Sequence, residues 1–196
     1  ATVAAAGQNP APAPAPPAAV PDLAAVVATY KIEVVTRRPA FPVKITHGVI
    51  DGAEADKADA DTYGAIFAVE WALYPPELVR RTGLKKVVFC KDLSFEKQLR
   101  TAVPDFENDV LYLDVARGRH DDLYVRKVIH HDFYHIIDLR DDGRLYEDER
   151  WARLNPPNFR YGPGGAKLQD DPTVTAPRDD PGFLNRYATA GVEEDK

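Results

Sequence analysis

The chain has 196 residues, of which 44% are hydrophobic and 29% charged, and its formal net charge is -6. These values are typical of a globular protein with one domain. Acidic residues outnumber basic ones by 31 to 25 and no Lys/Arg cluster is present, which argues against nucleic acid as a partner. No run of about 18 apolar residues occurs, so we expect no membrane span.

The start of the chain is rich in Ala and Pro, a composition that favours an extended spacer and cannot pack a core. We therefore expect a disordered linker at residues 1–21 and a single domain at residues 22–196. The chain contains no Met, and its small-residue start is what would remain after removal of an export signal. This predicts a secreted, periplasmic or cell-surface protein; the oligomeric state is left open.

The residue pattern predicts an α+β fold in which a small mixed or antiparallel sheet packs on helices. Alternating apolar residues predict strands at 30–36, 85–90 and 109–115, and a strand at 43–46 that pairs with the first. The single cysteine, Cys90, ends one of these apolar runs and is expected to be a buried structural thiol, so a Cys-based zinc site is excluded.

Helical spacing of apolar residues predicts helices at 56–74, 77–82 and 123–140. Asp121 or Asp122 is expected to cap the third of these, and Gly143 follows its end. Residues 143–186 are so rich in Pro and Gly that they predict a long irregular insertion.

The predicted helix at 123–140 holds His131 and His135, which lie one turn apart on one face because they are four residues apart. Two imidazoles placed in this way can bind one Zn²⁺ ion. At about 100° per residue, Asp138 falls on the side of the two histidines. The opposite side is apolar and is expected to face the core; it carries Val125, Ile129, Phe133 and Ile136.

Asp132 occupies the position at which H-E-x-x-H zinc peptidases carry their general base. His130 lies about 100° around the helix from His131, so we expect a structural or second-shell role for it. The alternative for the pair is two core histidines that bind no metal. His47 and His120 are isolated and are expected to be ordinary surface histidines.

A catalytic zinc needs three protein ligands and one open position. No third histidine follows His135 at the spacing that metzincins use. We therefore expect a carboxylate as the third ligand, and the acidic segment 192–195 at the end of the chain is its best source.

The segment His131–Asp138, which reads H-D-F-Y-H-I-I-D, resembles the H-E-F-x-H-x-x-D helix of the anthrax lethal factor-like zinc peptidases, which are gluzincins. Tyr187, followed seven residues later by Glu194, is similar to the Tyr and the third-ligand Glu of that family. The chain resembles still more the bacterial zinc-binding metallopeptidases, often exported, that carry an H-H-E-x-x-H helix and a late Glu-Glu-Asp segment. The resemblance covers about residues 85–196.

This resemblance implies a zincin-like fold in which His131 and His135 bind zinc with Glu194, or with Glu193, as third ligand. It further implies that Tyr187 donates a hydrogen bond to the oxyanion and that Asp138 orients a ligand histidine. An extended peptide substrate would pair along an edge strand, which is expected at Val110, Leu111, Tyr112, Leu113 and Asp114.

The function that follows is a zinc-dependent metallopeptidase, which hydrolyses peptide bonds through zinc-activated water with Asp132 as the base. Asp is shorter than the Glu of the family by about 1.5 Å, and a misplacement of about 1 Å can cost on the order of 10²-fold in rate. The alternative is a catalytically weak or inactive zinc-binding homologue that acts as a secreted or surface binding protein. Only two residues follow Glu194, whereas the family's Glu lies on a helix that continues, so a C-terminally truncated domain is a further expectation.

Overall fold

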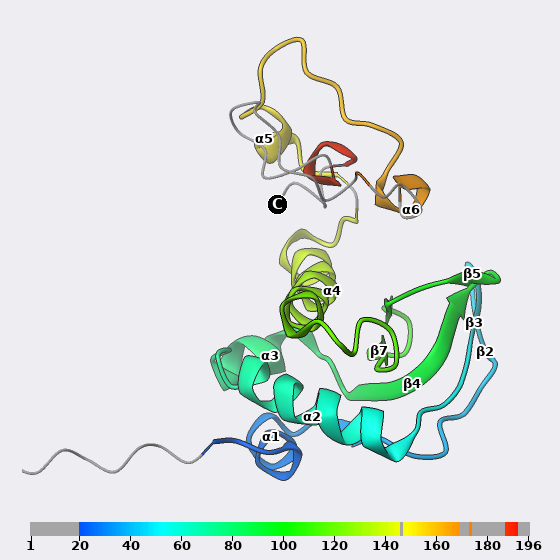
Figure 1. Cartoon of the computed structure of the whole chain (residues 1–196). Coiled ribbons are helices and arrows are strands. Elements are labelled where there is room, and N and C mark those ends of the chain that lie inside the picture. Colours follow the sequence, from blue (N-terminus) through cyan, green and yellow to red (C-terminus); the bar gives the residue numbers. More distant parts are fainter. Residues whose placement is uncertain (1–19, 146, 169–172, 174–186, 192–196) are drawn as a thin grey trace, which may run out of the picture.

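The computed structural model describes residues 20–145, 147–168, 173 and 187–191, so the linker expected at 1–21 lies almost wholly outside the described residues. These residues form an α+β fold with a seven-stranded mixed sheet, as predicted (Figure 1). Among them, no helix combines the length and the apolar character that crossing a membrane requires.

The sheet has the order β2-β3-β4-β7-β6, and β1 and β5 also pair with β4. The long strand β4 changes neighbours along its length. Its first half runs parallel to both β1 and β7, and its second half runs antiparallel to both β3 and β5. The strands are β1 (Glu33–Val35), β2 (Val43–Ile45), β3 (Gly48–Glu54), β4 (Lys86–Phe95), β5 (Gln98–Leu99), β6 (Ala102–Asp105) and β7 (Val110–Asp114).

The pairing predicted between the strands at 43–46 and 30–36 is wrong. β2 instead forms an antiparallel hairpin with β3, which follows it after a tight turn, and Val43 lies opposite Ile50. β1 joins β4 in parallel, with Glu33 opposite Lys86. The nearest partner in sequence is therefore the one that β2 takes, because a short antiparallel connection closes a smaller loop.

The prediction that Val110–Asp114 is an edge strand is also wrong. This strand is β7, and it lies between β4 and β6 with all five residues buried. Burial on both faces explains why it is so apolar. Among the described residues, the outer strand on this side is β6, whose four residues include Pro104 and therefore gave no strand signal in the sequence.

The helices α1–α4 pack apolar side chains against one face of the sheet. Trp71 on α2 stacks on Phe67 with ring centroids 4.7 Å apart, and it meets Phe133 on α4 at 4.5 Å. All three rings are fully buried, so they join α2 to α4. The helices are α1 (Leu23–Tyr30), α2 (Lys57–Trp71), α3 (Pro76–Thr82), α4 (Asp122–Asp142), α5 (Glu149–Ala152) and α6 (Gly165–Leu168), with a 3₁₀ turn η1 (Tyr187–Thr189).

The capping residues at both ends of α4 are those that the sequence predicts, although the helix extends one residue before and two residues beyond the predicted 123–140. The side chain of Asp121 accepts a hydrogen bond from the backbone N–H of Tyr124 at 3.0 Å, which caps the N-terminus. Gly143 ends the helix in the left-handed conformation with φ of 78°. α4 therefore spans Asp122–Asp142 and carries the two histidines in its middle.

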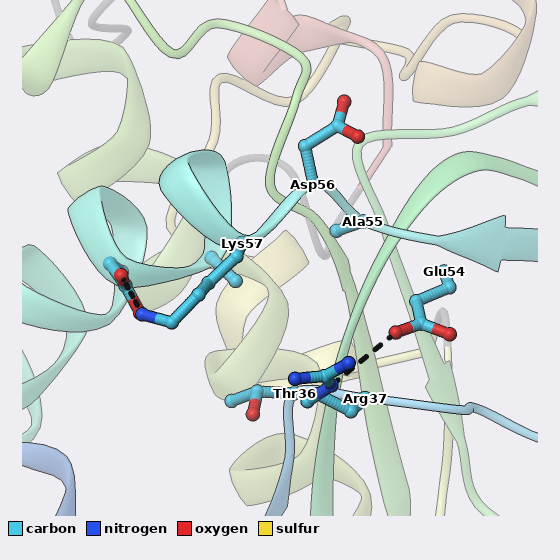
Figure 2. Close-up of a pocket in the computed structure, with 8 residues that line it drawn as sticks. Thr36, Arg37, Glu54, Ala55, Asp56 and Lys57 are labelled. Atoms are coloured by element: carbon cyan, nitrogen blue, oxygen red, sulfur yellow. Dashed lines mark hydrogen bonds and ion pairs between the residues drawn. The ribbon is translucent and has the colours of Figure 1, made fainter.

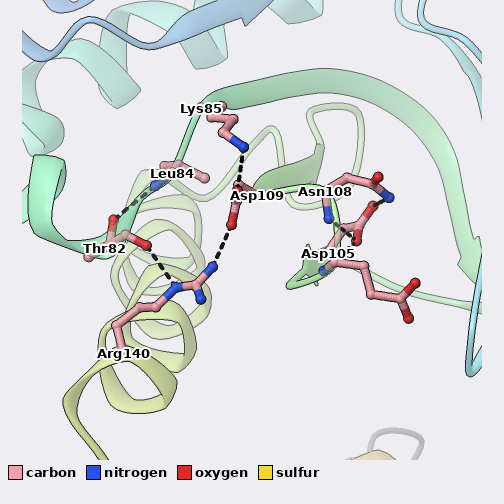
Figure 3. A network of polar contacts seen from close by, with 8 residues as sticks. Thr82, Leu84, Lys85, Asp105, Asn108, Asp109 and Arg140 are labelled. Atoms are coloured by element: carbon pink, nitrogen blue, oxygen red, sulfur yellow. Dashed lines mark hydrogen bonds and ion pairs between the residues drawn. The ribbon is translucent and has the colours of Figure 1, made fainter. Parts of the chain in front are cut away.

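Arg140 fastens the C-terminal end of α4 to the body of the protein (Figure 3). Its Nε donates to the backbone oxygen of Thr82 at 2.9 Å, and its guanidinium forms an ion pair with Asp109. Asp109 also pairs with Nζ of Lys85 at 2.7 Å. The turns before β4 and before β7 thus hold α4 in a fixed orientation over the sheet.

Candidate metal centre

The imidazole rings of His131 and His135 face one another on successive turns of α4. Their Nε2 atoms lie 3.1 Å apart, and the ring planes are inclined at 82°. Two nitrogens at 2.0–2.1 Å from a tetrahedral zinc ion are about 3.3 Å apart. The spacing of this donor pair therefore fits one zinc ion with very little movement. It equally allows one ring to donate an N–H hydrogen bond to the other.

Burial disfavours the charged form of both rings. Burial lowers the pKa of His131 below its ordinary value. Burial, and then the proximity of His131, lower the pKa of His135 to about 3. A neutral imidazole keeps the lone pair that a metal ion needs, so the pair is in the right protonation state for binding.

Tyr187 is brought to this pair from a distant part of the chain. Its ring lies against His131, with centroids 5.6 Å apart. The turn η1 that carries it is held by two backbone hydrogen bonds of 2.9 Å, from Gly162 to the oxygen of Thr189 and from Gly164 to the oxygen of Ala190. In Figure 1 this turn lies in the group of short helices beyond the end of α4.

Asp132 projects from α4 between the histidine side and the core. Only 8% of the residue is exposed. Burial raises the pKa of its carboxyl to about 7, and the positive charge of Arg100 acts in the opposite direction. Asp132 thus follows His131 directly on the helix, and its carboxyl group is buried.

His130 faces the other flank of α4 and joins it to α2. Its Nε2 lies 2.8 Å from a carboxylate oxygen of Glu70, and its Nδ1 lies 2.5 Å from the hydroxyl of Tyr74. In the neutral ring, Nε2–H donates a hydrogen bond to Glu70, and Nδ1 accepts one from the hydroxyl of Tyr74. Glu70 also forms an ion pair with Arg126. Burial, and then the charge of Arg126, lower the pKa of His130.

The structure therefore does not bring His130 to the pair formed by His131 and His135. Its partners Glu70 and Tyr74 were not predicted as site residues, although both lie within the helix predicted at 56–74. Asp138 is buried on α4, three residues beyond His135. Its assigned role in orienting a ligand stays a prediction.

The residues predicted as third ligand lie outside the part of the chain that the structure describes. Among the described residues, no group of three or more His, Cys, Asp or Glu side chains could hold a metal ion. Glu193 and Glu194, which are the predicted sources of the carboxylate, fall outside those residues. The described part of the centre is thus a pair of nitrogen donors with an acid beside it and a tyrosine against it.

A surface pocket of about 550 Å³ lies elsewhere, where β1, β3 and the start of α2 meet (Figure 2). Its charges largely neutralise each other: Arg37 lies 3.6 Å from Glu54, and Lys57 lies 2.5 Å from Asp61. None of the residues that line it belongs to the imidazole pair.

Comparison of the chain with known protein families, characterised proteins and solved structures found no significant match.

Proposed function

We propose that this protein is a zinc-dependent metallopeptidase. The observation that carries the proposal is the 3.1 Å separation between the Nε2 atoms of His131 and His135, which suits two ligands of one zinc ion. Partial burial supports it, since it favours the neutral form of both imidazoles, which is the form that binds a metal ion. The nearby tyrosine and carboxylate extend the pair to a set of groups suited to hydrolysis.

His131 and His135 would hold the zinc ion, with Glu194, or Glu193, as third ligand. When bound, zinc polarises a carbonyl group and lowers the pKa of water in its coordination sphere. Asp132 would accept the proton of the attacking water. Tyr187, whose ring lies against His131, would donate a hydrogen bond from its hydroxyl to the oxygen of the substrate carbonyl as negative charge develops there.

The substrate would be an extended peptide that adds to the sheet at β6, in place of the β7 edge that the sequence predicted. Among the described residues, β6 is the outermost strand on this side, and α4 packs against it. This contact would bring a bound peptide close to the helix that carries the histidines.

A second function, zinc binding without catalysis, is favoured by one feature of the same site. Asp132 is shorter by about 1.5 Å than the Glu usual at this position, and it is 92% buried by the helix and its neighbours. If this carboxylate cannot reach the attacking water, the protein would bind zinc and peptides without cleaving the peptides.

The test of the first function starts from protein loaded with one zinc ion per chain, as measured by elemental analysis. Cleavage of a peptide library is then followed by mass spectrometry with and without a chelator. We expect cleavage that the chelator abolishes and that added zinc restores. Fully loaded protein that cleaves nothing in the library would contradict a peptidase.

Asp132→Glu separates the two functions. A gain in cleavage rate would show that the Asp132 side chain is too short to act as an efficient base, as in an enzyme that has lost activity. An unchanged absence of cleavage, with zinc still bound, would favour the binding protein. His131→Ala serves as the control, because it removes a ligand and should abolish any zinc-dependent cleavage in either background.

A further inference from the structure

The turn η1 and the glycine-containing segment beside it show how Tyr187 is kept against His131. We propose that Gly164 is a positioning residue of the metal centre, which acts through η1 to set the contact between these two rings. This rests on the proposed function, in that the place of Tyr187 matters for hydrolysis only if the imidazole pair binds zinc. It adds a residue that had no predicted role in the site.

The turn η1 depends on groups outside itself for its conformation. A helix end leaves its last carbonyl groups without partners inside the helix. In η1 these are the oxygens of Thr189 and Ala190, whereas the oxygen of Tyr187 accepts the N–H of Ala190 at 2.9 Å. A single turn is too short to be stable by itself, so donors from another part of the chain are needed to hold it.

The segment from Gly162 to Gly164, which leads into α6, supplies two such donors. The N–H of Gly162 donates to the oxygen of Thr189, and the N–H of Gly164 donates to the oxygen of Ala190, both at 2.9 Å. Pro163 stands between the two and has no N–H to offer. The two backbones approach closely, because a Cβ atom added to Gly162 would lie 3.5 Å from the Cα of Ala190.

Gly164 has a backbone conformation that other residues rarely adopt. Its φ is 88°, in the left-handed region where a side chain is strained. Among the described residues, no heavy atom lies within 4 Å of the place that a Cβ would take, so conformation rather than space requires the glycine. Its oxygen accepts the N–H of Lys167 at 3.2 Å in α6. A change of φ would therefore alter the angle between α6 and the N–H that binds Ala190.

The packing of η1 carries such a change to the aromatic contact. Ala188 and Ala190 are buried, with 6% and 1% of each exposed, so the turn is seated in the protein on both sides of Thr189. Tyr187 begins the turn and is bonded to Ala190 through its own oxygen, so a displaced Ala190 moves Tyr187 as well. The ring of Tyr187 lies 5.6 Å from that of His131, with the planes inclined at 59°.

This contact can be measured without zinc and without catalysis, because an aromatic ring shifts the NMR signals of nuclei close to it. The Hε1 signals of the five histidines are recorded in zinc-free protein at pH 8, and His131 is assigned by its loss in His131→Gln. Tyr187→Leu gives the position of this signal without the ring. We expect Gly164→Ala to move the signal in the same direction by half of that change or more. Gly164→Asn should move it less, since Asn enters the left-handed region more readily.

Gly83→Ala is the matched control. Gly83 ends α3 with φ of 73°, and no described heavy atom lies within 4 Å of an added Cβ, so the substitution brings the same kind of strain at another turn. It should leave the His131 signal unchanged. The double variant Gly164→Ala/Tyr187→Leu should keep the signal of Tyr187→Leu, because the glycine acts through the tyrosine. Thermal unfolding of each variant shows whether it is folded.

In zinc-loaded protein that cleaves peptides, Gly164→Ala should lower kcat by about 10-fold to 10²-fold with KM little changed, whereas Gly83→Ala should not. An unmoved His131 signal in Gly164→Ala, an unchanged kcat, or an equal shift with and without the Tyr187 side chain would overturn the proposal even if zinc-dependent cleavage were found. The expected shift in a protein that cleaves nothing would support the placing of Tyr187 by Gly164 and contradict the peptidase alone.

Discussion

The phenol ring of Tyr187 lies against the imidazole of His131, with ring centroids 5.6 Å apart, although 56 positions of sequence separate them. A hydroxyl that stabilises negative charge only during the reaction should affect rate rather than metal binding. We expect Tyr187→Phe to lower kcat by about 10²-fold and to leave zinc stoichiometry unchanged, because Phe keeps the ring contact. Steady-state kinetics and elemental analysis of the same preparation measure both. Equal kcat in the two proteins would exclude a role for the hydroxyl.

The donor pair on α4 should couple zinc binding to stability. Zinc that binds only the folded chain raises the free energy of unfolding by about 2.7 kcal/mol when its free concentration is 100 times Kd. Urea unfolding with and without zinc should show this increase in the wild type. His131→Ala and His135→Ala should each abolish it. His47→Ala, a change at an exposed turn, should retain the full increase, and its loss there would indicate non-specific binding.

Glu70 supports the α2–α4 interface through its contacts with His130 and Arg126. Because the carboxylate is largely buried and both partners are half exposed, we expect Glu70→Ala to lower the free energy of unfolding by about 1–3 kcal/mol. Glu77→Ala is the control, since it breaks an exposed ion pair with Arg80 and should cost less than about 1 kcal/mol. Similar losses in both variants would mean that the buried network adds no stability.

Cys90 is fully buried and its Sγ donates to the backbone oxygen of Leu113 at 3.4 Å. Burial, and then the charges of Asp114 and Asp92, raise the pKa of its thiol. We therefore expect no reaction with iodoacetamide in the native state at pH 8, and complete alkylation in urea, followed by mass spectrometry. Rapid alkylation of native protein would contradict the buried position.

The same thiol should make the protein less stable in alkali. The unfolded thiol ionises near pH 8.5, whereas the native thiol keeps its proton, so the native state binds more protons above that pH. The free energy of unfolding should fall as pH rises from 8 to 9.5, by at most about 1.4 kcal/mol per unit. Cys90→Ala should show a shallower fall, and an identical slope would assign the effect to other groups.

The elements that the sequence predicted correctly are those with local signals. α4 has a capping Asp121, apolar residues at helical spacing and a terminal Gly143, and each of these acts within a few residues. The strand β7 was likewise evident from its run of apolar residues. The helix α1 was missed although Asp22 caps it, because its eight residues are almost uniformly apolar and follow the Ala/Pro segment.

The order of the strands could not be predicted, since it depends on contacts between distant residues. Nothing within Val110–Asp114 indicates that β6 covers its outer side, and four residues with a proline give little sign of a strand. In the same way, the pairing of His130 with Glu70 follows from the packing of α2 on α4. The spacing of His131 and His135 was predictable from the helix alone.

Tyr30 gives α1 an importance that its length does not suggest. Its hydroxyl lies 2.9 Å from the backbone oxygens of both Trp71 and Tyr74, at and just beyond the end of α2. Removing α1 would take away this hydrogen-bond donor and expose part of the aromatic cluster formed by Phe67 and Trp71. Any shortened version of the protein intended for expression should therefore begin before Asp22, however dispensable the residues ahead of it prove to be.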